Sequence, residues 1–168
     1  MALGVALIEP QIPPNTGNIA RLCAATDTAL HLIGPLGFSL DDERLRRAGL
    51  DYWEDVDLWL HPEWRWFRQV VSRERCLYFS AHGGRSYLEA PFSEKSVLVF
   101  GNETSGMPRR IREKHRERIF RIPMRGTVRN LNLATAVGIV LYEAIRRLGI
   151  RLEEEQRPRD LSAASVSG

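Results

Sequence analysis

The chain has 168 residues, of which 43% are hydrophobic and 27% charged, and its formal net charge is +3. This composition is typical of one globular domain large enough to bury a sizeable core. The longest apolar stretch, residues 131–141, is interrupted by Asn132 and Thr135 and is far shorter than the ~20 residues of a bilayer-spanning helix. The composition therefore excludes a membrane-spanning protein.

The N-terminus and the cysteines indicate the cellular compartment. The first ten residues, MALGVALIEP, carry no basic residue and reach Glu9 and a proline quickly, so we expect no secretory signal peptide. Cys23 and Cys76 both lie inside apolar patterns, which predicts small core residues in preference to a disulfide. We therefore expect a cytoplasmic protein.

The positive charge is distributed unevenly along the chain. Residues 109–129 contain nine basic residues and only two acidic ones, Glu113 and Glu117, which leaves the rest of the chain net acidic. Such asymmetry is typical of a face that meets a polyanion such as a nucleic acid. A solvated helix surface in an arginine-rich chain gives the same pattern, and charge alone does not separate the two interpretations.

Strand-like and helix-like patterns alternate along the chain. We expect strands at residues 3–8, 30–33, 56–60, 76–80, 96–100 and 118–122. We expect helices at residues 16–28, 41–48, 62–72, 108–114 and 131–148. Asn15 or Thr16 is expected to cap the first helix, Pro62 to open the third at its first position, and Gly149 to end the last. This alternation predicts an α/β fold with a mostly parallel sheet flanked by helices.

The last helix and the C-terminal tail define the domain organisation. We expect a single domain over residues 1–150, followed by a charged and then Ser/Ala-rich tail over residues 151–168. The helix at residues 131–148 is apolar or small at almost every position to Leu141, so it has no polar face for solvent there. Since one sheet face in so small a chain does not cover both sides of such a helix, this pattern predicts a homodimer.

Common catalytic and nucleotide-binding signatures are absent. The chain has no G-x-G-x-x-G after its first strand, no P-loop and no G-x-S-x-G elbow. Its four histidines are far apart in sequence and none is paired with a cysteine at zinc spacing, so no metal is expected. Four tryptophans offer base-stacking surfaces, but Trp59 and Trp64 fit core positions better.

Three polar, glycine-containing segments remain, each next to an expected strand. They are residues 15–21 (NTGNIAR), 100–108 (FGNETSGMP) and 122–133 (IPMRGTVRNLNL). Glycine allows close backbone approach and positive φ, and the start of the long helix exposes amide donors. In a helix, Asn15 and Arg21 would lie about 120° apart around the axis, whereas a non-helical start would bring them closer.

These segments, read together as N-x-G-N-x-x-R, V-F-G-x-E-x-x-G-x-P and I-P-M … R-x-L-N-L-x-x-A-V, resemble the SPOUT superfamily of RNA methyltransferases. The similarity covers roughly residues 3–150. It is strongest to the minimal branch, the tRNA wobble-nucleotide (cytidine/uridine) 2′-O-methyltransferases. The resemblance implies a C-terminal trefoil knot, S-adenosylmethionine as cofactor, tRNA as substrate, and a homodimer through the first and last helices.

The resemblance also assigns residues. It implies that backbone groups of Phe79, Ser80, Gly101, Ile122 and Asn130 hold the cofactor. It implies that Arg21, Asn15, Glu103 and Asn132 shape the reacting centre. Many relatives carry serine where this chain has Asn130, so a role that needs a hydroxyl is not carried over. The basic stretch 109–129, with Arg44, Arg46 and Arg47, is the predicted RNA surface.

The predicted reaction is an in-line methyl transfer from the sulfonium to a ribose 2′-hydroxyl. Because arginine stays protonated, Arg21 is expected to stabilise the developing alkoxide and not to act as a simple base. Three alternatives remain open at this stage. They are 2′-O-methylation of another tRNA position or of rRNA, a catalytically silent RNA-binding module, and a small anion- or nucleotide-binding metabolic enzyme.

Overall fold

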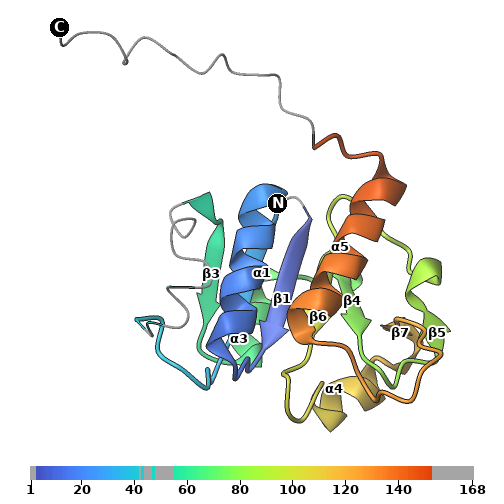
Figure 1. Ribbon diagram of the computed structural model, residues 1–168, viewed down its shortest axis with the longest axis horizontal. Coiled ribbons are helices and arrows are strands. Elements are labelled where there is room, and N and C mark those ends of the chain that lie inside the picture. Colours follow the sequence, from blue (N-terminus) through green and yellow to red (C-terminus); the bar gives the residue numbers. More distant parts are fainter. Residues whose placement is uncertain (1–2, 42, 44–46, 48–54, 153–168) are drawn as a thin grey trace, which may run out of the picture.

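The computed structural model describes residues 3–41, 43, 47 and 55–152. Its centre is a seven-stranded sheet of order β3-β2-β1-β6-β4-β7-β5. The strands are β1 (Gly4–Ile8), β2 (Ala29–Ile33), β3 (Leu58–His61), β4 (Cys76–Phe79), β5 (Arg85–Ser86), β6 (Val97–Phe100) and β7 (Ile119–Arg121). Every neighbouring pair is parallel. The predicted α/β fold with a parallel sheet is therefore confirmed (Figure 1).

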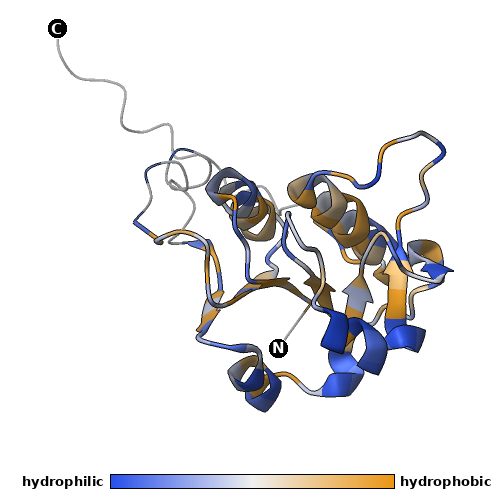
Figure 2. Ribbon diagram, turned by 90° about the horizontal axis from the view of Figure 1, so that it is seen from below, coloured by the Kyte–Doolittle hydropathy of each residue, from blue (hydrophilic) through white to orange (hydrophobic). Residues whose placement is uncertain are grey.

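The helices form a layer on each face of this sheet. The regular helices are α1 (Pro13–Ala25), α3 (Trp64–Val70), α4 (Arg109–Lys114) and α5 (Leu133–Leu148). Short 3₁₀ turns occur at η2 (Arg73–Arg75), η3 (Tyr87–Glu89) and η4 (Arg116–Arg118). Figure 2 shows α1 and α5 on one side of the sheet and α3 and α4 on the other.

Alternation along the strands produces two separate cores. In β1, Val5 and Leu7 belong to the cluster under α1 and α5, whereas Ala6 and Ile8 belong to the cluster under α3 and α4. Successive side chains of a strand point to opposite faces, so a strand buried on both sides must be apolar throughout. Cys23 lies in the first cluster and Cys76 in the second, and both are free thiols, as predicted.

Helix α1 begins earlier than predicted. Its first residue is Pro13 and its N-cap residue is Ile12, whose side chain forms no capping hydrogen bond. The prediction that Asn15 or Thr16 caps the helix is wrong, since both lie inside it. Proline is compatible with a first helical turn because it has a suitable φ and no amide hydrogen to satisfy there. A proline pair therefore starts this helix where a polar cap was expected.

Other boundaries differ in smaller ways. Helix α3 starts at Trp64 after an extended Glu63, so the expectation that Pro62 opens it at its first position is wrong. The short strand β5 was not predicted, because two residues carry too little periodicity. Gly149 ends α5 in the left-handed region with φ 65°, as predicted. Most of the helix expected at residues 41–48 and the tail beyond residue 152 lie outside the described residues.

Two predictions concern membranes and metals. No helix in the described ranges is long and apolar enough to cross a bilayer. The same residues contain no cluster of three or more potential metal ligands.

The fold brings together two histidines that are distant in sequence. His31 Nδ1 lies 3.0 Å from His61 Nε2. Burial, with the neighbouring His61 and Arg75, lowers the pKa of His31 to about 4.

Candidate functional site

A cavity of about 620 Å³ lies at the carboxyl ends of β4, β6 and β7. We call it the large cavity. Its walls come from four segments: Ile12 and Asn15 at the start of α1, residues 79–82, residues 100–107, and residues between Arg112 and Ala136. Ligands of open parallel sheets bind at this edge, because the loops that follow the strands converge there. The volume is within the usual range of small-molecule sites.

Eight of the nine predicted site residues line the large cavity. They are Asn15, Phe79, Ser80, Gly101, Glu103, Ile122, Asn130 and Asn132. Arg21 does not line it, and its side chain is exposed on α1. Since α1 is already helical at Asn15, the two side chains point about 120° apart around the axis. The fold therefore brings the three segments together but leaves Arg21 outside its own chain's cavity.

Three side chains from the three segments form a hydrogen-bonded chain. Asn15 Nδ2 donates to Glu103 Oε1 at 3.2 Å, and Asn132 Nδ2 donates to Asn15 Oδ1 at 2.9 Å. Asn132 is also the N-cap of α5, where its Oδ1 accepts from the backbone N–H of Thr135 at 3.2 Å. This chain fixes the start of α1, the loop after β6 and the start of α5 relative to one another.

Glu103 is held by the backbone before α1. Its Oε2 accepts from Gln11 N at 2.8 Å, and its Oε1 accepts from Ile12 N at 3.1 Å. The carboxylate thus accepts from two backbone amides just before α1. The N-cap residue Ile12 has no side-chain acceptor of its own, so Glu103 takes the place of a local cap. Because both oxygens are engaged in this way, the geometry favours a positioning role for Glu103 within the site.

The loop after β6 is folded upon itself. Asn102 Oδ1 accepts from Thr104 N at 3.0 Å and from Ser105 N at 2.7 Å, and Gly106 has φ 68°. A Cβ placed on Gly101 would lie 2.2 Å from Gly106 C and Met107 N. Glycine is therefore needed at position 101 because the backbone of Gly106 and Met107 leaves no space for a side chain. Any larger residue there would displace the loop that forms the cavity wall.

Aromatic rings make the cavity's apolar wall. Phe79 and Phe100 both line it, with ring centroids 5.2 Å apart. Phe92 stacks against Phe79 from behind at 6.3 Å. Both side chains are at most 4% exposed, so they belong to the core and border the cavity only at its apolar side. An apolar border with polar groups around it is usual for small-molecule sites.

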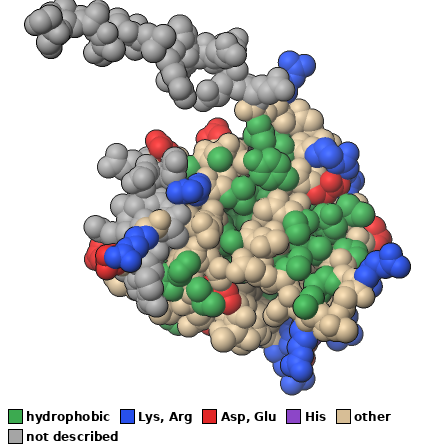
Figure 3. Space-filling view, viewed as in Figure 1, with side chains coloured by type: hydrophobic (Ala, Val, Ile, Leu, Met, Phe, Trp, Pro, Cys, Tyr) green, Lys and Arg blue, Asp and Glu red, His purple; other side chains and the backbone are tan. Residues whose placement is uncertain are grey.

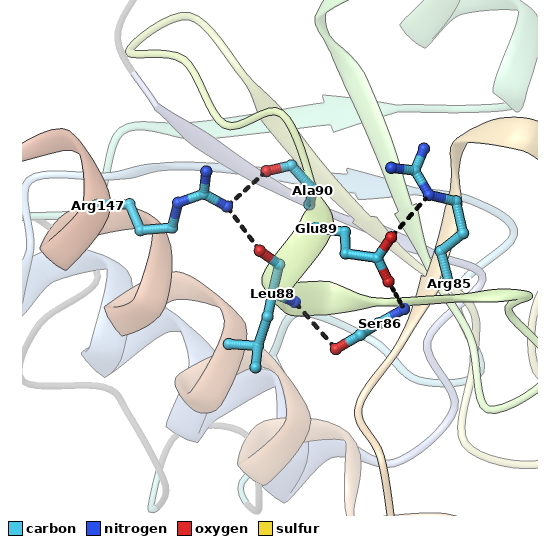
Figure 4. A network of polar contacts seen from close by, with 6 residues as sticks. All are labelled: Arg85, Ser86, Leu88, Glu89, Ala90 and Arg147. Carbon is cyan, nitrogen blue, oxygen red and sulfur yellow. Dashed lines mark hydrogen bonds and ion pairs between the residues drawn. The ribbon is translucent and has the colours of Figure 1, made fainter.

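Helix α5 supports this wall from outside. Arg147 donates to the carbonyl oxygens of Leu88 at 2.8 Å and Ala90 at 3.0 Å, as Figure 4 shows. Its guanidinium also lies over the Phe92 ring, 5.5 Å from the centroid. In the same figure, Ser86 and Glu89 form a capping box at the start of η3. The segment after β4 is thereby fastened to the C-terminal end of α5.

Sequence reasoning missed several wall residues, among them Ile12, His82, Met124 and Arg112. Arg112 is notable because its Nε is buried and has no hydrogen-bond partner among the described residues. A buried donor without a partner is uncommon in proteins and calls for an explanation. The basic stretch 109–129 contains Arg112 and indicated a role in binding an anion. The spacing of its basic residues did not distinguish Arg112 from the exposed arginines beside it.

The cavity at the edge of the parallel sheet gathers the three polar segments on which the sequence resemblance to RNA methyltransferases rests. The chain belongs to the SpoU rRNA Methylase family, which matches residues 2–142.

Individual relatives are more specific. A protein of Geobacillus stearothermophilus named "Putative tRNA (cytidine(34)-2'-O)-methyltransferase" is 49% identical over 150 residues, covering 88% of this chain and 96% of its own. The Escherichia coli K12 tRNA (cytidine(34)-2'-O)-methyltransferase is 44% identical, covering 88% and 94%.

Solved structures agree with these relatives. One described as giving structural insights into the 2-OH methylation of C/U34 on tRNA has a TM-score of 0.81 and 48% identity, covering 89% of this chain and 97% of that one. The methyltransferase AviRb from Streptomyces viridochromogenes, in complex with AdoMet, has a TM-score of 0.77 and 26% identity, covering 87% of this chain and 57% of that one.

Proposed function

We propose that this protein transfers the methyl group of S-adenosylmethionine to the ribose 2′-hydroxyl of the wobble nucleotide, cytidine or uridine 34, of tRNA. The observation that carries the proposal is the assembly of all three polar segments around one cavity in a chain 49% identical to a relative named for that reaction. The family relationship supports methyl transfer to RNA, and the relatives' names support the wobble nucleotide.

The residues of the large cavity fit the cofactor. Phe79 and Phe100 give the cavity an apolar border that suits the adenine, and Ser80, Gly101 and Ile122 line the same space. Asn130 presents an amide at this wall, so it offers a donor and an acceptor where relatives with serine offer a hydroxyl. When bound, S-adenosylmethionine supplies an electrophilic methyl group whose leaving group is neutral. No protein acid is needed for its departure.

The ribose 2′-hydroxyl, however, must be activated as the nucleophile, because it is scarcely ionised near neutral pH. We assign to Arg21 the stabilisation of the negative charge that develops on this oxygen. The Glu103–Asn15–Asn132 chain acts as a set of positioning residues, because it holds the loop after β6 against the starts of α1 and α5. The deep trefoil knot expected around these loops stays a prediction.

The proposed active form is a homodimer through α1 and α5. In the single chain, one side of α5 packs on the sheet, while Tyr142 on the other side is 48% exposed. Figure 3 shows hydrophobic side chains gathered on the face that carries α1 and α5, with the visible Lys and Arg side chains mainly around its edge. Because Arg21 is exposed on α1 outside its own cavity, a dimer through these helices gives it access to the partner's cavity.

The test is methyl transfer from labelled S-adenosylmethionine into total tRNA lacking this modification, followed by mapping of the modified nucleotide. We expect the label on the ribose of nucleotide 34. Label at another tRNA position or in rRNA would identify a sibling activity, and binding of RNA without transfer would indicate a silent module.

A further inference from the structure

A second cavity of about 430 Å³ adjoins the large one, and we call it the small cavity. Its walls are formed by His82 and Gly84 after β4, by Arg109, Arg112 and Glu113 of α4, and by Arg116 and Ile119. His82 and Arg112 line both cavities, so the two spaces are neighbours separated by these side chains.

The small cavity is basic. Three arginines line it with a single carboxylate, Glu113, which already accepts from Arg109 Nε at 2.6 Å. Within the described ranges, neither Arg112 nor Arg116 forms an ion pair with a carboxylate. The walls therefore carry positive charge that the protein itself does not neutralise.

Arg112 carries the strongest signal. The buried Nε of Arg112 lacks a hydrogen-bond partner, although its side chain lines both spaces. Burying a charged donor without a partner is unfavourable unless a ligand supplies the acceptor. A guanidinium fits a phosphate especially well, since its donors form a planar fork that matches two phosphate oxygens.

We propose that the small cavity binds a backbone phosphate of the RNA strand that carries the target nucleotide. The proposal rests on the proposed function and adds a substrate subsite to it. Arg116 and Arg109 bind the phosphate from the solvent side, and Arg112 holds it beside the large cavity. The ribose that enters the large cavity is thereby placed at a fixed distance from a neighbouring phosphate.

Gly84 gives the proposal its sharpest test. A Cβ at this position would meet no heavy atom within 4 Å, so a side chain fits there without displacing the fold. This differs from Gly83, where a Cβ would lie 2.6 Å from the backbone carbon of Phe120. Gly84→Asp therefore places a negative charge in the small cavity, and Gly84→Ala makes the same backbone change without the charge.

The experiment measures binding of the wobble-containing anticodon stem-loop to the full chain at several salt concentrations. We expect Gly84→Asp and Arg116→Gln each to weaken binding by about tenfold, with Gly84→Ala much closer to the unchanged protein. Arg116→Gln should also reduce the slope of log K against log salt by about 0.7, the value for one lost phosphate contact on a single strand.

Controls separate this site from a general charge effect. Arg65→Gln removes one exposed arginine from α3, outside both cavities, and should change neither affinity nor slope by a comparable amount. Binding of S-adenosylhomocysteine reports that each variant still folds around the large cavity. Arg112 is not used as a test residue, because it lines both spaces.

Several results would overturn the proposal. Equal effects of Arg65→Gln and Arg116→Gln would reduce the site to a diffuse basic surface. Inorganic phosphate at constant ionic strength that competes as well as the stem-loop would indicate a small-anion site and not an RNA strand. The two proposals fail separately. If the wild-type protein methylates a different nucleotide, the wobble assignment is wrong, but the dependence of RNA binding on Arg116 and Gly84 is unaffected.

Discussion

The two helical layers of this protein differ in length and chemistry. Helices α1 and α5 have 13 and 16 residues, and they share one apolar cluster with the sheet. Helices α3 and α4 have 7 and 6 residues, and α4 bears arginines along its exposed surface, visible as the hydrophilic helix in Figure 2. Both layers expose apolar side chains, such as Tyr142 on α5 and Trp66 on α3, but the α4 side also carries Arg112 and Arg116, which form no ion pair with a described carboxylate.

We propose that the two layers serve two kinds of recognition on one small domain. The layer of α1 and α5, which we call the apolar layer, has the longer helices and is the one proposed to meet a second copy of the chain. The basic layer suits a polyanion, which needs dispersed cations and little apolar area. The site lies where loops connect the two layers, so both a protein partner and an RNA strand can reach it. The following predictions test whether this separation holds.

The largest expected effect is at Arg21, a cation on the apolar layer. Arg21→Ala should reduce methyl transfer to tRNA by ~10²-fold or more, as for loss of one charge-stabilising donor. Arg21→Lys should recover little, because a point charge does not reproduce the planar fork. S-adenosylhomocysteine affinity, measured by calorimetry, should stay within a few-fold. Loss of that affinity would make Arg21 structural, and full activity would remove it from the mechanism.

Mixed dimers should show which cavity Arg21 serves. Gly101→Ala should abolish cofactor binding, since its Cβ would collide with the backbone of Gly106 and Met107. Mixing this inactive variant with inactive Arg21→Ala should restore up to about a quarter of the activity if Arg21 acts on the partner's cavity. Restoration needs one subunit to supply the cavity and the other the arginine. An inactive mixture, with heterodimers demonstrated by differential tagging, would place Arg21 with its own chain's cavity.

Oligomeric state provides a matched comparison of the two layers. Tyr142 on α5 and Trp66 on α3 are 48% and 45% exposed, so both present similar apolar surface to solvent. Tyr142→Asp should convert the dimer to monomer at micromolar concentration, whereas Trp66→Asp should leave the dimer intact. Sedimentation velocity measures both. Dissociation by Trp66→Asp alone would put the interface on the other layer.

The smallest effect concerns pH and belongs to the α3/α4 side of the sheet. Burial lowers the pKa of His31 and of His115 to about 4 from 6.5. The unfolded chain therefore takes up protons that the native chain does not, and the free energy of unfolding falls as pH drops from 6.5 towards 4. The limiting slope is about 1.4 kcal/mol per pH unit for each histidine. Urea unfolding at pH 7 and pH 5 should show the loss, and His115→Phe, which keeps a ring against Tyr78, should reduce it. A flat profile would contradict the neutral, buried assignment.

Local patterns predicted the elements well wherever the signal was short-range. The six predicted strands exist, because apolar runs bounded by turn residues are a property of the chain itself. Gly149 ends α5 because a positive φ there favours glycine. The start of α1 was misplaced since the backbone just before it is held by Glu103, which accepts from the amides of Gln11 and Ile12. This partner is 92 and 91 residues away, so no local window contains it.

By itself the sequence determined the fold class, the positions of the three polar segments and the basic stretch, since each is encoded in neighbouring residues. Only the tertiary structure decided how those segments meet. It showed that Glu103, Asn15 and Asn132 form one hydrogen-bonded chain, and that Gly101 is confined by the protein's own backbone. It also turned Arg21 away from its own chain's cavity and brought Arg112 into both. The physical reason is that the parallel sheet gathers the ends of strands distant in sequence at one edge, and no periodicity along the chain records which side chains then face one another.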